Sequence, residues 1–545
     1  MSVPRIKFDG CDLAKQMGRV FAENLHDLAG KVDKGGNGYA PGFFHTSSMP
    51  HEGVHYYGDM WSRDVGRGII ELARLGFGAE AELTVNFALS GFNCGDHWGR
   101  VFNREDGSMY ETDGNVLLLL GICQTWKANG KNKTVGKGYL QSVMPVFRWM
   151  ERLMNECPYG YLLPCGSELS GNPDTPYTVY GVFANYGAKE AMSAFRDMAA
   201  FCGCGAEADY LAKMEGRLSQ AILTCLTAKK RVSLTKEGCW MNGLDGRDGR
   251  PYEFSEWAGT SWPIYHWTRQ LPFIFSYDRN VLRLPRDEFY ETHRATYEYI
   301  LDYMCQNEYF TKYGFVSNTG WTGTGGRHDD TMCGYGQGYM AQTALLMDDI
   351  NAYTKLLEGV ARLAYDGNIV KPLAFEFNPW VMHECFTYEN YGRGLDHTFG
   401  VRSEGRPGLM DNPGDEGNLV QEAEIIKALL IVTGVEGTET KGLRIMPRLP
   451  WTWDEMSLWD FPVWDGENRS SLDFHITHSR WLRKCGFEIN CTIPLENAEI
   501  RLGPFPLNAR FEQAGNQCVE TGKNGVWLTL KGLSGKNIEG EVEAL

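Results

Sequence analysis

Apolar residues recur at intervals of three or four over most of the first 440 residues, which is the spacing of an amphipathic helix. In residues 11–28, for example, Leu13, Met17, Phe21 and Leu25 fall on one face. About twelve such segments follow one another, and the spacing predicts a helix in each. The expected ranges are 11–28, 62–76, 79–90, 114–128, 137–155, 177–202, 206–228, 259–270, 288–306, 335–348, 350–364 and 418–434.

The even-numbered helices of this series differ from the odd-numbered ones. The even-numbered helices carry small residues such as Gly66, Gly121 and Gly338, which allow close packing in an inner ring. The odd-numbered helices, such as 206–228, mix charge with an apolar stripe, as an outer ring requires. The alternation predicts a mainly α fold, an (α/α)6 barrel of six helical hairpins. Its parallel inner helices would begin at one mouth, at residues 62, 114, 177, 259, 335 and 418.

The pattern changes after residue 440, where Pro447 and Pro450 mark a boundary. The later segments alternate apolar and polar residues between Gly and Asn turns, which is typical of strands. The clearest are 471–476, 487–493, 499–502 and 525–530. We therefore predict two domains, a catalytic barrel over residues 1–440 and a small antiparallel, sandwich-like β-domain over residues 441–545.

Composition and charge narrow the function classes. Hydrophobic residues make up 43% of the 545 residues, enough for a substantial core. The net charge of −16 and the lack of a basic stripe argue against a nucleic-acid partner. No apolar run approaches the roughly 18 residues of a membrane-spanning helix, so no membrane partner is expected.

The cysteines and the N-terminus bear on the compartment. The 15 cysteines include no CxxC pair, which favours buried thiols over a zinc site or a disulfide framework. Thiols suit a reducing compartment, and no apolar leader follows Met1, so we predict a cytoplasmic protein. A secreted chain whose leader has been removed would begin in the same way.

Clusters of acids, aromatics and glycines stand at or before the starts of the six expected inner helices. One cap needs only one Ser, Thr, Asn or Asp, so these clusters exceed what capping requires. If the six helix starts converge, the clusters line one pocket with carboxylates and aromatic rings, as a sugar-cleaving site requires. The clusters are residues 57–64, 110–114, 167–174, 253–259, 327–330 and 411–417.

The first cluster contains Tyr57 and the sequence Trp61-Ser-Arg63-Asp64. Arg63 offers a planar fork of donors and Asp64 offers two acceptors, while the two rings provide a platform for a sugar face. A purely structural Arg–Asp ion pair is the alternative interpretation.

The Trp-x-Arg-Asp segment resembles that of glucoamylase- and trehalase-type six-hairpin glycosidases, and Asp113-Gly114 at the fourth helix resembles the same group. The resemblance implies that Arg63 and Asp64 bind hydroxyls of the sugar at the cleavage point. A β-domain after the barrel resembles the layout of the rhamnosidase-like and trehalose-phosphorylase-like members.

Glycosidic hydrolysis requires a general acid and a second carboxylate. In the families that the chain resembles, the acid lies between the fifth and sixth helices, and the base lies just before the last inner helix. Glu168 is the expected acid, although Ser167 precedes it where glucoamylases have Trp. Asp174 is the alternative acid, or a cap of the sixth helix.

The base is expected in the long segment 365–417, which is rich in Asp and Glu. Glu416, directly before Gly-Asn-Leu and the final helix, is our choice. Glu384 is the rival, and Asp415 is a candidate N-cap of that helix. For an inverting enzyme we expect the carboxyls of Glu168 and Glu416 to lie about 6.5–9.5 Å apart.

The remaining clusters are expected to hold substrate. The residues predicted to contact the sugar, besides those named above, are Asp113, Glu256, Trp257, His328, Asp330 and Trp380, with Trp321 as an alternative to Trp380. His328 with its neighbouring acids also resembles the corner of a metal site, but hydrogen-bonded structure is the more ordinary role, and no metal is predicted. No GxGxxG or GxxxxGK[ST] motif is present, so no nucleotide cofactor is expected.

Together these features predict an exo-acting, inverting glycoside hydrolase with a carbohydrate partner and no cofactor. An inverting phosphorylase is the first alternative, because Arg402 and Arg406 would suit a phosphate site near the last helix. A polysaccharide lyase toroid and a non-catalytic carbohydrate-binding toroid are the others. The sequence leaves the sugar, the anomer, the linkage and the oligomeric state open.

Overall fold

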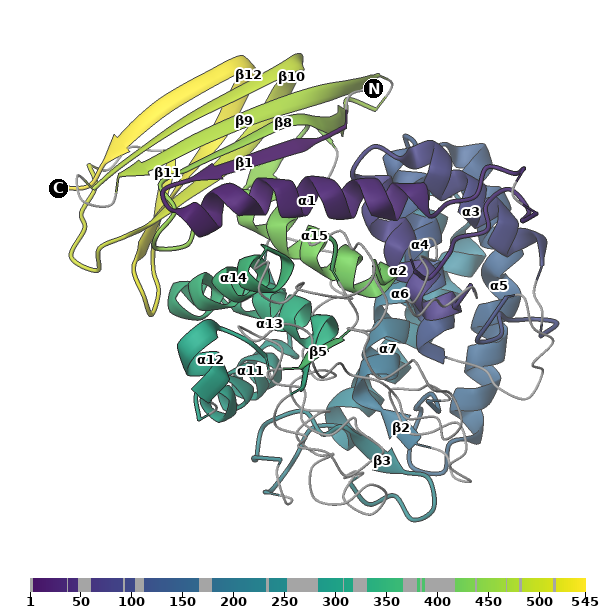
Figure 1. Cartoon of the computed structure of the whole chain (residues 1–545). Coiled ribbons are helices and arrows are strands. Elements are labelled where there is room, and N and C mark those ends of the chain that lie inside the picture. The colour runs from purple at the N-terminus through teal and green to yellow at the C-terminus, as the bar shows by residue number, and fades with distance from the viewer. Residues whose placement is uncertain are drawn as a thin grey trace, which may run out of the picture.

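The chain forms a helical body with a large antiparallel sheet packed beside it (Figure 1). The computed structural model describes most of the chain. The described ranges are 3–36, 38–47, 60–91, 94–102, 112–165, 179–231, 235–251, 283–306, 308–316, 331–365, 380–382, 385–387, 417–436, 439–466, 468–479, 483–512 and 516–545.

The helices match the predicted series closely. They are α1 (Asp12–Gly30), α2 (Ser62–Arg74), α3 (Gly78–Ser90), α4 (Thr112–Ala128), α5 (Lys133–Glu156), α6 (Val182–Cys202), α7 (Gly205–Cys225), α11 (Tyr290–Met304), α12 (Glu308–Tyr313), α13 (Gly334–Leu346), α14 (Ile350–Tyr365) and α15 (Leu419–Thr433). The six-residue α12 was not predicted, and the helix expected at 259–270 lies outside the described residues.

The start of α6 is the largest error among these boundaries. The sequence predicts position 177, but a short strand, β2 (Val179–Gly181), comes first and pairs with β3 (Gly243–Asp245). Gly181 is therefore the N-cap of α6, so the capping role considered for Asp174 is wrong. Each remaining described helix boundary falls within about four residues of its prediction, as expected for boundaries read from periodicity.

The predicted inner helices contact one another in sequence. On α2 and α4, a Cβ at Gly66 would lie 2.4 Å from the backbone nitrogen of Leu118. The Cys123 thiol of α4 donates to the carbonyl of Ala194 on α6 at 3.7 Å. Gln342 of α13 donates to the carbonyl of Glu424 on α15 at 3.0 Å. On α2 and α4 the contacts Ser62 with Gly114, Gly66 with Leu118 and Ile69 with Gly121 follow one another in the same direction, so these two helices are parallel.

A buried ion pair between Arg67 and Glu424 joins α2 to α15 and completes the series α13, α15, α2, α4, α6. These five helices form the described part of the expected inner ring. Because the sixth inner helix is expected within residues 252–282, outside the described part, closure into an (α/α)6 barrel stays a prediction.

Glycine at position 66 is required by this close packing. We expect Gly66→Ala to lower the free energy of unfolding by about 2 kcal/mol, because the new methyl group meets the rigid backbone of α4. Gly138 on α5 has no atom within 4 Å of an added Cβ, and Gly138→Ala should instead stabilise by roughly 0.5–1 kcal/mol. Urea unfolding followed by tryptophan fluorescence measures both, and equal effects at the two sites would contradict the packing.

Helix α11 packs on α6 through His293. The indole N–H of Trp240 donates to His293 Nδ1 at 3.1 Å, and Tyr186 Oη lies 3.2 Å from Nε2. An imidazolium would set its Nδ1–H against the indole N–H, so the folded protein holds this ring neutral. Burial, with the nearby charge of Lys189, lowers the pKa of His293 to about 3.

A neutral buried histidine makes stability depend on pH. The unfolded chain takes up the proton below a pKa of about 6.5, whereas the folded chain takes it up only near 3, so acidification through this window favours unfolding. Between pH 7 and pH 5 we expect His293 to remove about 2 kcal/mol of stability. His293→Gln keeps an acceptor for Trp240, and its urea midpoint should fall less over the same interval. An identical pH profile for the variant would contradict this assignment.

The C-terminal sheet confirms the predicted change of pattern. Its path is β1-β8-β9-β10-β12-β11, all antiparallel; the short strand β7 (Arg444–Ile445) pairs in parallel with β10, and β6 (Val435–Glu436) pairs with β7. The long strands are β8 (Glu455–Trp464), β9 (Arg469–Ser479), β10 (Lys484–Phe505), β11 (Gln517–Thr521) and β12 (Val526–Glu543). The segments predicted as strands lie almost entirely within β9, β10 and β12.

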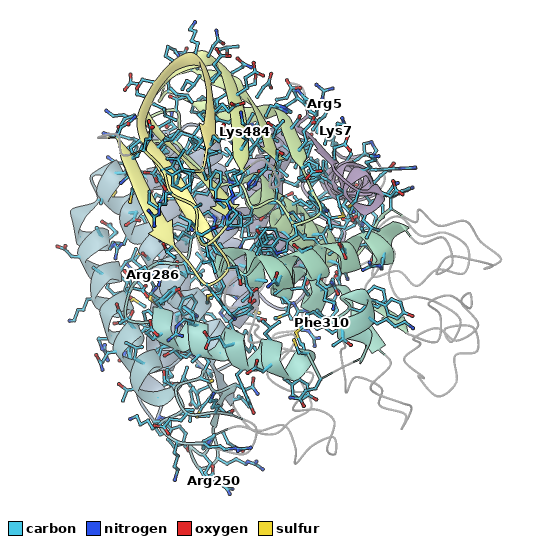
Figure 2. The ribbon with its side chains drawn as sticks, turned by 90° about the vertical axis from the view of Figure 1, so that its left-hand side faces the viewer. Arg5, Lys7, Arg250, Arg286, Phe310 and Lys484 are labelled. Carbon is cyan, nitrogen blue, oxygen red and sulfur yellow. The ribbon has the colours of Figure 1, made fainter. Side chains whose placement is uncertain are left out.

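One strand comes from the other end of the chain. β1 (Arg5–Asp9) pairs with β8 along the edge of the sheet, next to α1 in Figure 1. Ile6 and Phe8 are buried, and Phe8 packs on Trp453 with ring centroids 4.7 Å apart. Arg5 and Lys7 point outward from this edge (Figure 2). The sheet therefore includes residues that the sequence analysis assigned to the helical domain, and a division near residue 440 stays a prediction.

A partly buried carboxylate fastens the sheet to the helical body. Asp348, in the turn between α13 and α14, accepts from Arg448 at 2.9 Å and from both terminal nitrogens of Arg501 on β10 at 3.0 Å. Burial alone would raise the pKa of Asp348, but these two guanidinium groups outweigh it and hold the pKa below its ordinary value. The turn after α13 is thus a fixed junction between the two bodies.

None of the described helices combines the length and the apolar character that crossing a membrane requires.

Candidate functional site

The starts of α2 and α4 meet directly. A Cβ at Gly114 would lie 2.2 Å from the hydroxyl of Ser62 and 3.1 Å from the backbone nitrogen of Arg63. Only glycine allows this approach, so the Asp113-Gly114 sequence brings the first turn of α4 against that of α2. The polar residues of the two helix starts consequently form one group.

Three of the predicted site residues form this group, which we call the Arg63 triad: Arg63, Asp64 and Asp113. Arg63 Nε donates to Asp64 Oδ1 at 3.2 Å, and Arg63 Nη1 lies 4.0 Å from Asp113 Oδ2. All three side chains are buried. Asp113 also accepts from the backbone N–H of Gly114 at 3.0 Å. The positive ends of two helices meet here, which favours anionic groups at this place.

Trp61 stands beside the triad at the N-cap of α2. The guanidinium of Arg100 lies over its ring at 4.4 Å, and its backbone bridges to Val101. The segment that carries Arg100 is held in turn by Asn115 of α4, which accepts from the backbone N–H of Trp98 at 3.0 Å and donates to its carbonyl at 2.8 Å. Trp61 is therefore fixed against α2 and α4, with its ring only partly buried.

The start of α15 lies next to the start of α2. Thr46 joins them, because its carbonyl accepts from the N–H of Leu419 at 2.8 Å and its hydroxyl oxygen from the N–H of Trp61 at 3.4 Å. The side chain of Asn418 caps α15 by accepting from the N–H of Val420 at 3.2 Å, so the capping role considered for Asp415 is wrong. Glu416, the predicted base, comes two residues before this cap; its own position lies outside the described residues.

The start of α6 approaches the same region. The Thr112 hydroxyl donates to the carbonyl of Pro164 at 3.0 Å, and the next residue, Cys165, bridges to Val179 of β2. Burial is the main cause that raises the pKa of the Cys165 thiol, and the charge of Asp113 adds to it. Cys165 is therefore a neutral neighbour of the triad, and the sequence analysis did not single it out.

Below the triad, a second polar group that the sequence analysis missed joins α2 and α15. We call Arg67, Glu71, Glu424 and Lys427 the buried charge cluster. Arg67 Nη1 donates to Glu71 at 2.7 Å, and Arg67 Nε donates to Glu424. Arg67 lies one turn beyond Arg63 on α2, so the cluster forms the floor beneath the triad.

The charges in this cluster shift one another's titration. Burial alone would raise the pKa of Glu71, but the charges of Arg74 and Arg67 outweigh burial and hold that pKa below its ordinary value. Burial, with the charge of Arg67, lowers the pKa of Lys427 to about 7. The cluster fixes how α2 and α15 sit against each other, and hence how the triad sits relative to the segment that carries Glu416.

Trp380 is the remaining predicted residue that the structure describes. It is buried against outer helix α1, where Arg19 lies 4.1 Å over its ring and Asn24 donates to its carbonyl at 2.9 Å. No described contact brings it to the Arg63 triad, and its predicted stacking role stays untested. The predicted residues outside the described part of the chain are Tyr57, Glu168, Asp174, Glu256, Trp257, Trp321, His328, Asp330, Glu384 and Glu416.

Within the described ranges, no three or more His, Cys, Asp and Glu side chains gather in a way that would hold a metal ion.

Comparison with solved structures identifies proteins of similar fold. An α-L-rhamnosidase from Dictyoglumus thermophilum has a TM-score of 0.56 at 9% identity, over 100% of this chain and 51% of its own. The enzyme from Aspergillus terreus has a TM-score of 0.53 at 10% identity, over 99% and 50%. The enzyme from Streptomyces avermitilis, solved with L-rhamnose, has a TM-score of 0.52 at 12% identity, over 99% and 42%. No family model and no curated protein matches the chain.

The likeness supports the fold that the Trp61–Asp64 motif implied. Solved α-L-rhamnosidases of this kind belong to an (α/α)6-barrel glycosidase family. This chain spans about half the length of the rhamnosidases that it matches. At identities of 9–12% the likeness concerns the fold alone.

Proposed function

We propose that the protein is a glycoside hydrolase that removes a terminal sugar with inversion of configuration. The observation that carries the proposal is the Arg63 triad, a buried Arg–Asp–Asp group at the joined starts of α2 and α4. The rhamnosidase-like fold supports it, because the triad occupies a helix start of the kind at which six-hairpin glycosidases bind sugar.

The triad has the chemistry to bind sugar hydroxyls. A hydroxyl can donate to Asp64 or Asp113 and accept from Arg63, so adjacent hydroxyls of one ring can satisfy the donors and acceptors together. Hydrogen bonds to charged groups are the stronger kind, which helps to offset the loss of water from the sugar. Trp61 beside the triad offers an aromatic face for the apolar side of the ring.

In the proposed reaction Glu168 is the general acid and Glu416 the general base. Glu168 gives its proton to the glycosidic oxygen as the bond to the anomeric carbon breaks. Glu416 takes a proton from a water whose oxygen bonds to the opposite face of that carbon. The products are a free sugar of inverted configuration and the alcohol. The two carboxyl groups must lie about 6.5–9.5 Å apart to leave room for the water. Glu416 then releases its proton to solvent and Glu168 takes one up, which restores the enzyme.

The test is a panel of nitrophenyl glycosides, each assayed with and without inorganic phosphate. α-L-Rhamnoside comes first, because the solved proteins of similar fold act on or bind that sugar. We expect release of nitrophenol from one sugar of the panel, independent of phosphate. Phosphate-dependent release would establish the phosphorylase instead, and an unsaturated product from a uronate polymer would establish a lyase. Binding of sugars without any turnover would contradict the proposal.

A further inference from the structure

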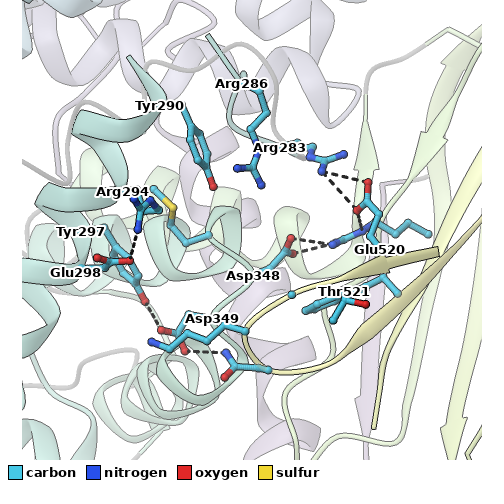
Figure 3. A pocket seen from close by; sticks show the side chains of 16 residues that line it. Arg283, Arg286, Tyr290, Arg294, Tyr297, Glu298, Asp348, Asp349, Glu520 and Thr521 are labelled. Atoms are coloured by element: carbon cyan, nitrogen blue, oxygen red, sulfur yellow. Dashed lines mark hydrogen bonds and ion pairs between the residues drawn. The ribbon is translucent and has the colours of Figure 1, made fainter. Parts of the chain in front are cut away.

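A cavity of about 640 Å³ lies between the helical body and the sheet, and nothing in the proposed reaction uses it. Its walls come from the start of α11, the turn between α13 and α14, and the turn that joins β11 to β12 (Figure 3). Small-molecule sites typically enclose roughly 300–1,000 Å³, so this interdomain cavity has the size of a ligand site.

The interdomain cavity is remote from the Arg63 triad. The triad lies at the starts of the parallel inner helices, whereas Met347, Asp348 and Asp349 of the cavity come after the end of α13. A helix of 13 residues is roughly 20 Å long, so about that length separates the cavity from the start of the same helix. A ligand here would therefore lie at the far end of α13 from the predicted mouth of the barrel.

Charged side chains dominate the cavity wall. Four carboxylates line it, and each already has a partner. Asp348 pairs with Arg448 and Arg501, and Glu520 pairs with Arg283 and Arg501. Glu298 pairs with Arg294, and Asp349 accepts from the Tyr297 hydroxyl at 3.1 Å and from Asn524 at 3.4 Å.

Five cationic side chains also line the cavity. Two of them, Arg286 and Lys523, differ from the carboxylates in their pairing. The guanidinium of Arg286 lies 3.9 Å over the ring of Tyr290, and Figure 3 shows it directed toward the centre of the cavity. Within the described part of the chain, no carboxylate lies within ion-pair distance of Arg286 or of Lys523. Arg286 comes from the helical body and is labelled below the ends of the strands in Figure 2, and Lys523 comes from the exposed β11–β12 turn. Two cations without a carboxylate partner among the described residues attract anions locally, even in a protein with a net charge of −16.

We propose that the interdomain cavity is a second ligand site, which binds a small molecule carrying an oxyanion such as a phosphate. The arginine fork suits a phosphate or carboxylate bidentately, and the stacked Tyr290 holds that fork in place. Lys523, on the β11–β12 turn, adds a point charge from the sheet side of the cavity. Because the ligand touches both bodies, its binding stabilises the junction at Asp348. The proposal does not depend on the proposed reaction.

Calorimetric titration of the full-length protein tests the site, at constant ionic strength set with sodium chloride. The probes are inorganic phosphate, glucose 6-phosphate and glucuronate, with glucose as the uncharged comparison. We expect saturable binding of at least one anion, accompanied by a higher Tm, and no effect of glucose at this site. Glucose 6-phosphate binding more tightly than phosphate would indicate a sugar phosphate, and equal affinity would indicate free phosphate; both support the site.

Two variants locate the binding. Arg286→Gln and Lys523→Gln should each weaken the anion at least tenfold, and Lys523 is exposed, so its replacement spares the fold. Arg217→Gln is the matched control, because Arg217 also stacks on a tyrosine, 3.6 Å over the ring of Tyr161, but lies outside the cavity. Absence of saturable binding of all three anions, or unchanged affinity in both cavity variants, would overturn the proposal.

Discussion

Glu416→Gln is expected to lower kcat/KM by about a thousandfold, whatever the leaving group of the substrate. In the proposed reaction Glu416 activates the water, and no property of the leaving group replaces that step. Steady-state kinetics on two glycosides of the preferred sugar, with a dinitrophenyl and a methoxyphenyl leaving group, measures the effect.

Glu168→Gln should behave differently on the same two substrates. The general acid assists only departure of the leaving group, so the methoxyphenyl glycoside should lose about a thousandfold while the dinitrophenyl glycoside loses far less. Asp174→Asn and Glu384→Gln serve as matched controls and should keep most activity. Full activity in Glu168→Gln or Glu416→Gln would show that the carboxylate is misassigned, and Asp174 and Glu384 would take its place.

The second large effect concerns stability. We expect Arg67→Met to lower the free energy of unfolding by about 4 kcal/mol, because it leaves Glu71 and Glu424 buried without their shared cation. An exposed pair should matter far less, so Lys484→Met, which frees Glu541 and Glu543, should leave the free energy of unfolding nearly unchanged. Urea unfolding at pH 7 measures both.

A double variant separates buried charge from lost packing. Glu71 keeps its ion pair with Arg74, whereas Glu424 loses its pair with Arg67, so the double variant Arg67→Met with Glu424→Gln removes the carboxylate left unpaired. We expect the double variant to be more stable than Arg67→Met alone. If the double variant loses as much stability as the two single variants lose together, the pair does not act as a unit.

The buried charge cluster also links stability to the candidate site. Arg67 lies one helical turn from Arg63, and Glu424 lies in the helix that comes after Glu416. Misplacing α15 on α2 therefore moves the proposed base relative to the residues that bind the sugar. Small displacements of this kind are costly, because reacting groups must be held in a narrow range of geometry.

Periodicity predicted the helices well because the residues of each amphipathic face lie only three or four positions apart in the sequence. It missed β1, although Ile6 and Phe8 alternate with Arg5 and Lys7, because five residues are too few to stand out and their partner strand is some 450 positions away. It placed the start of α6 five residues too early, since β2 forms only by pairing with the distant β3.

The site was predicted in part for the same reason. Arg63, Asp64 and Asp113 were found because each stands in a short motif at a helix start. The cluster of Arg67 with Glu424 was missed, because the two residues are 357 positions apart and charges in a helix are ordinarily read as its exposed face. The sequence contained two signals of this cluster. They are the four-residue spacing of Arg67 and Glu71 and the charged residues within the otherwise apolar segment 419–433.

Proton NMR of the product during turnover tests the central claim most directly. The preferred glycoside is incubated in phosphate buffer, and the anomeric signal of the released sugar is recorded before mutarotation. We expect a free sugar whose first-formed anomer is opposite to that of the substrate. First formation of the same anomer, or of a sugar phosphate, would contradict the proposed inverting hydrolysis.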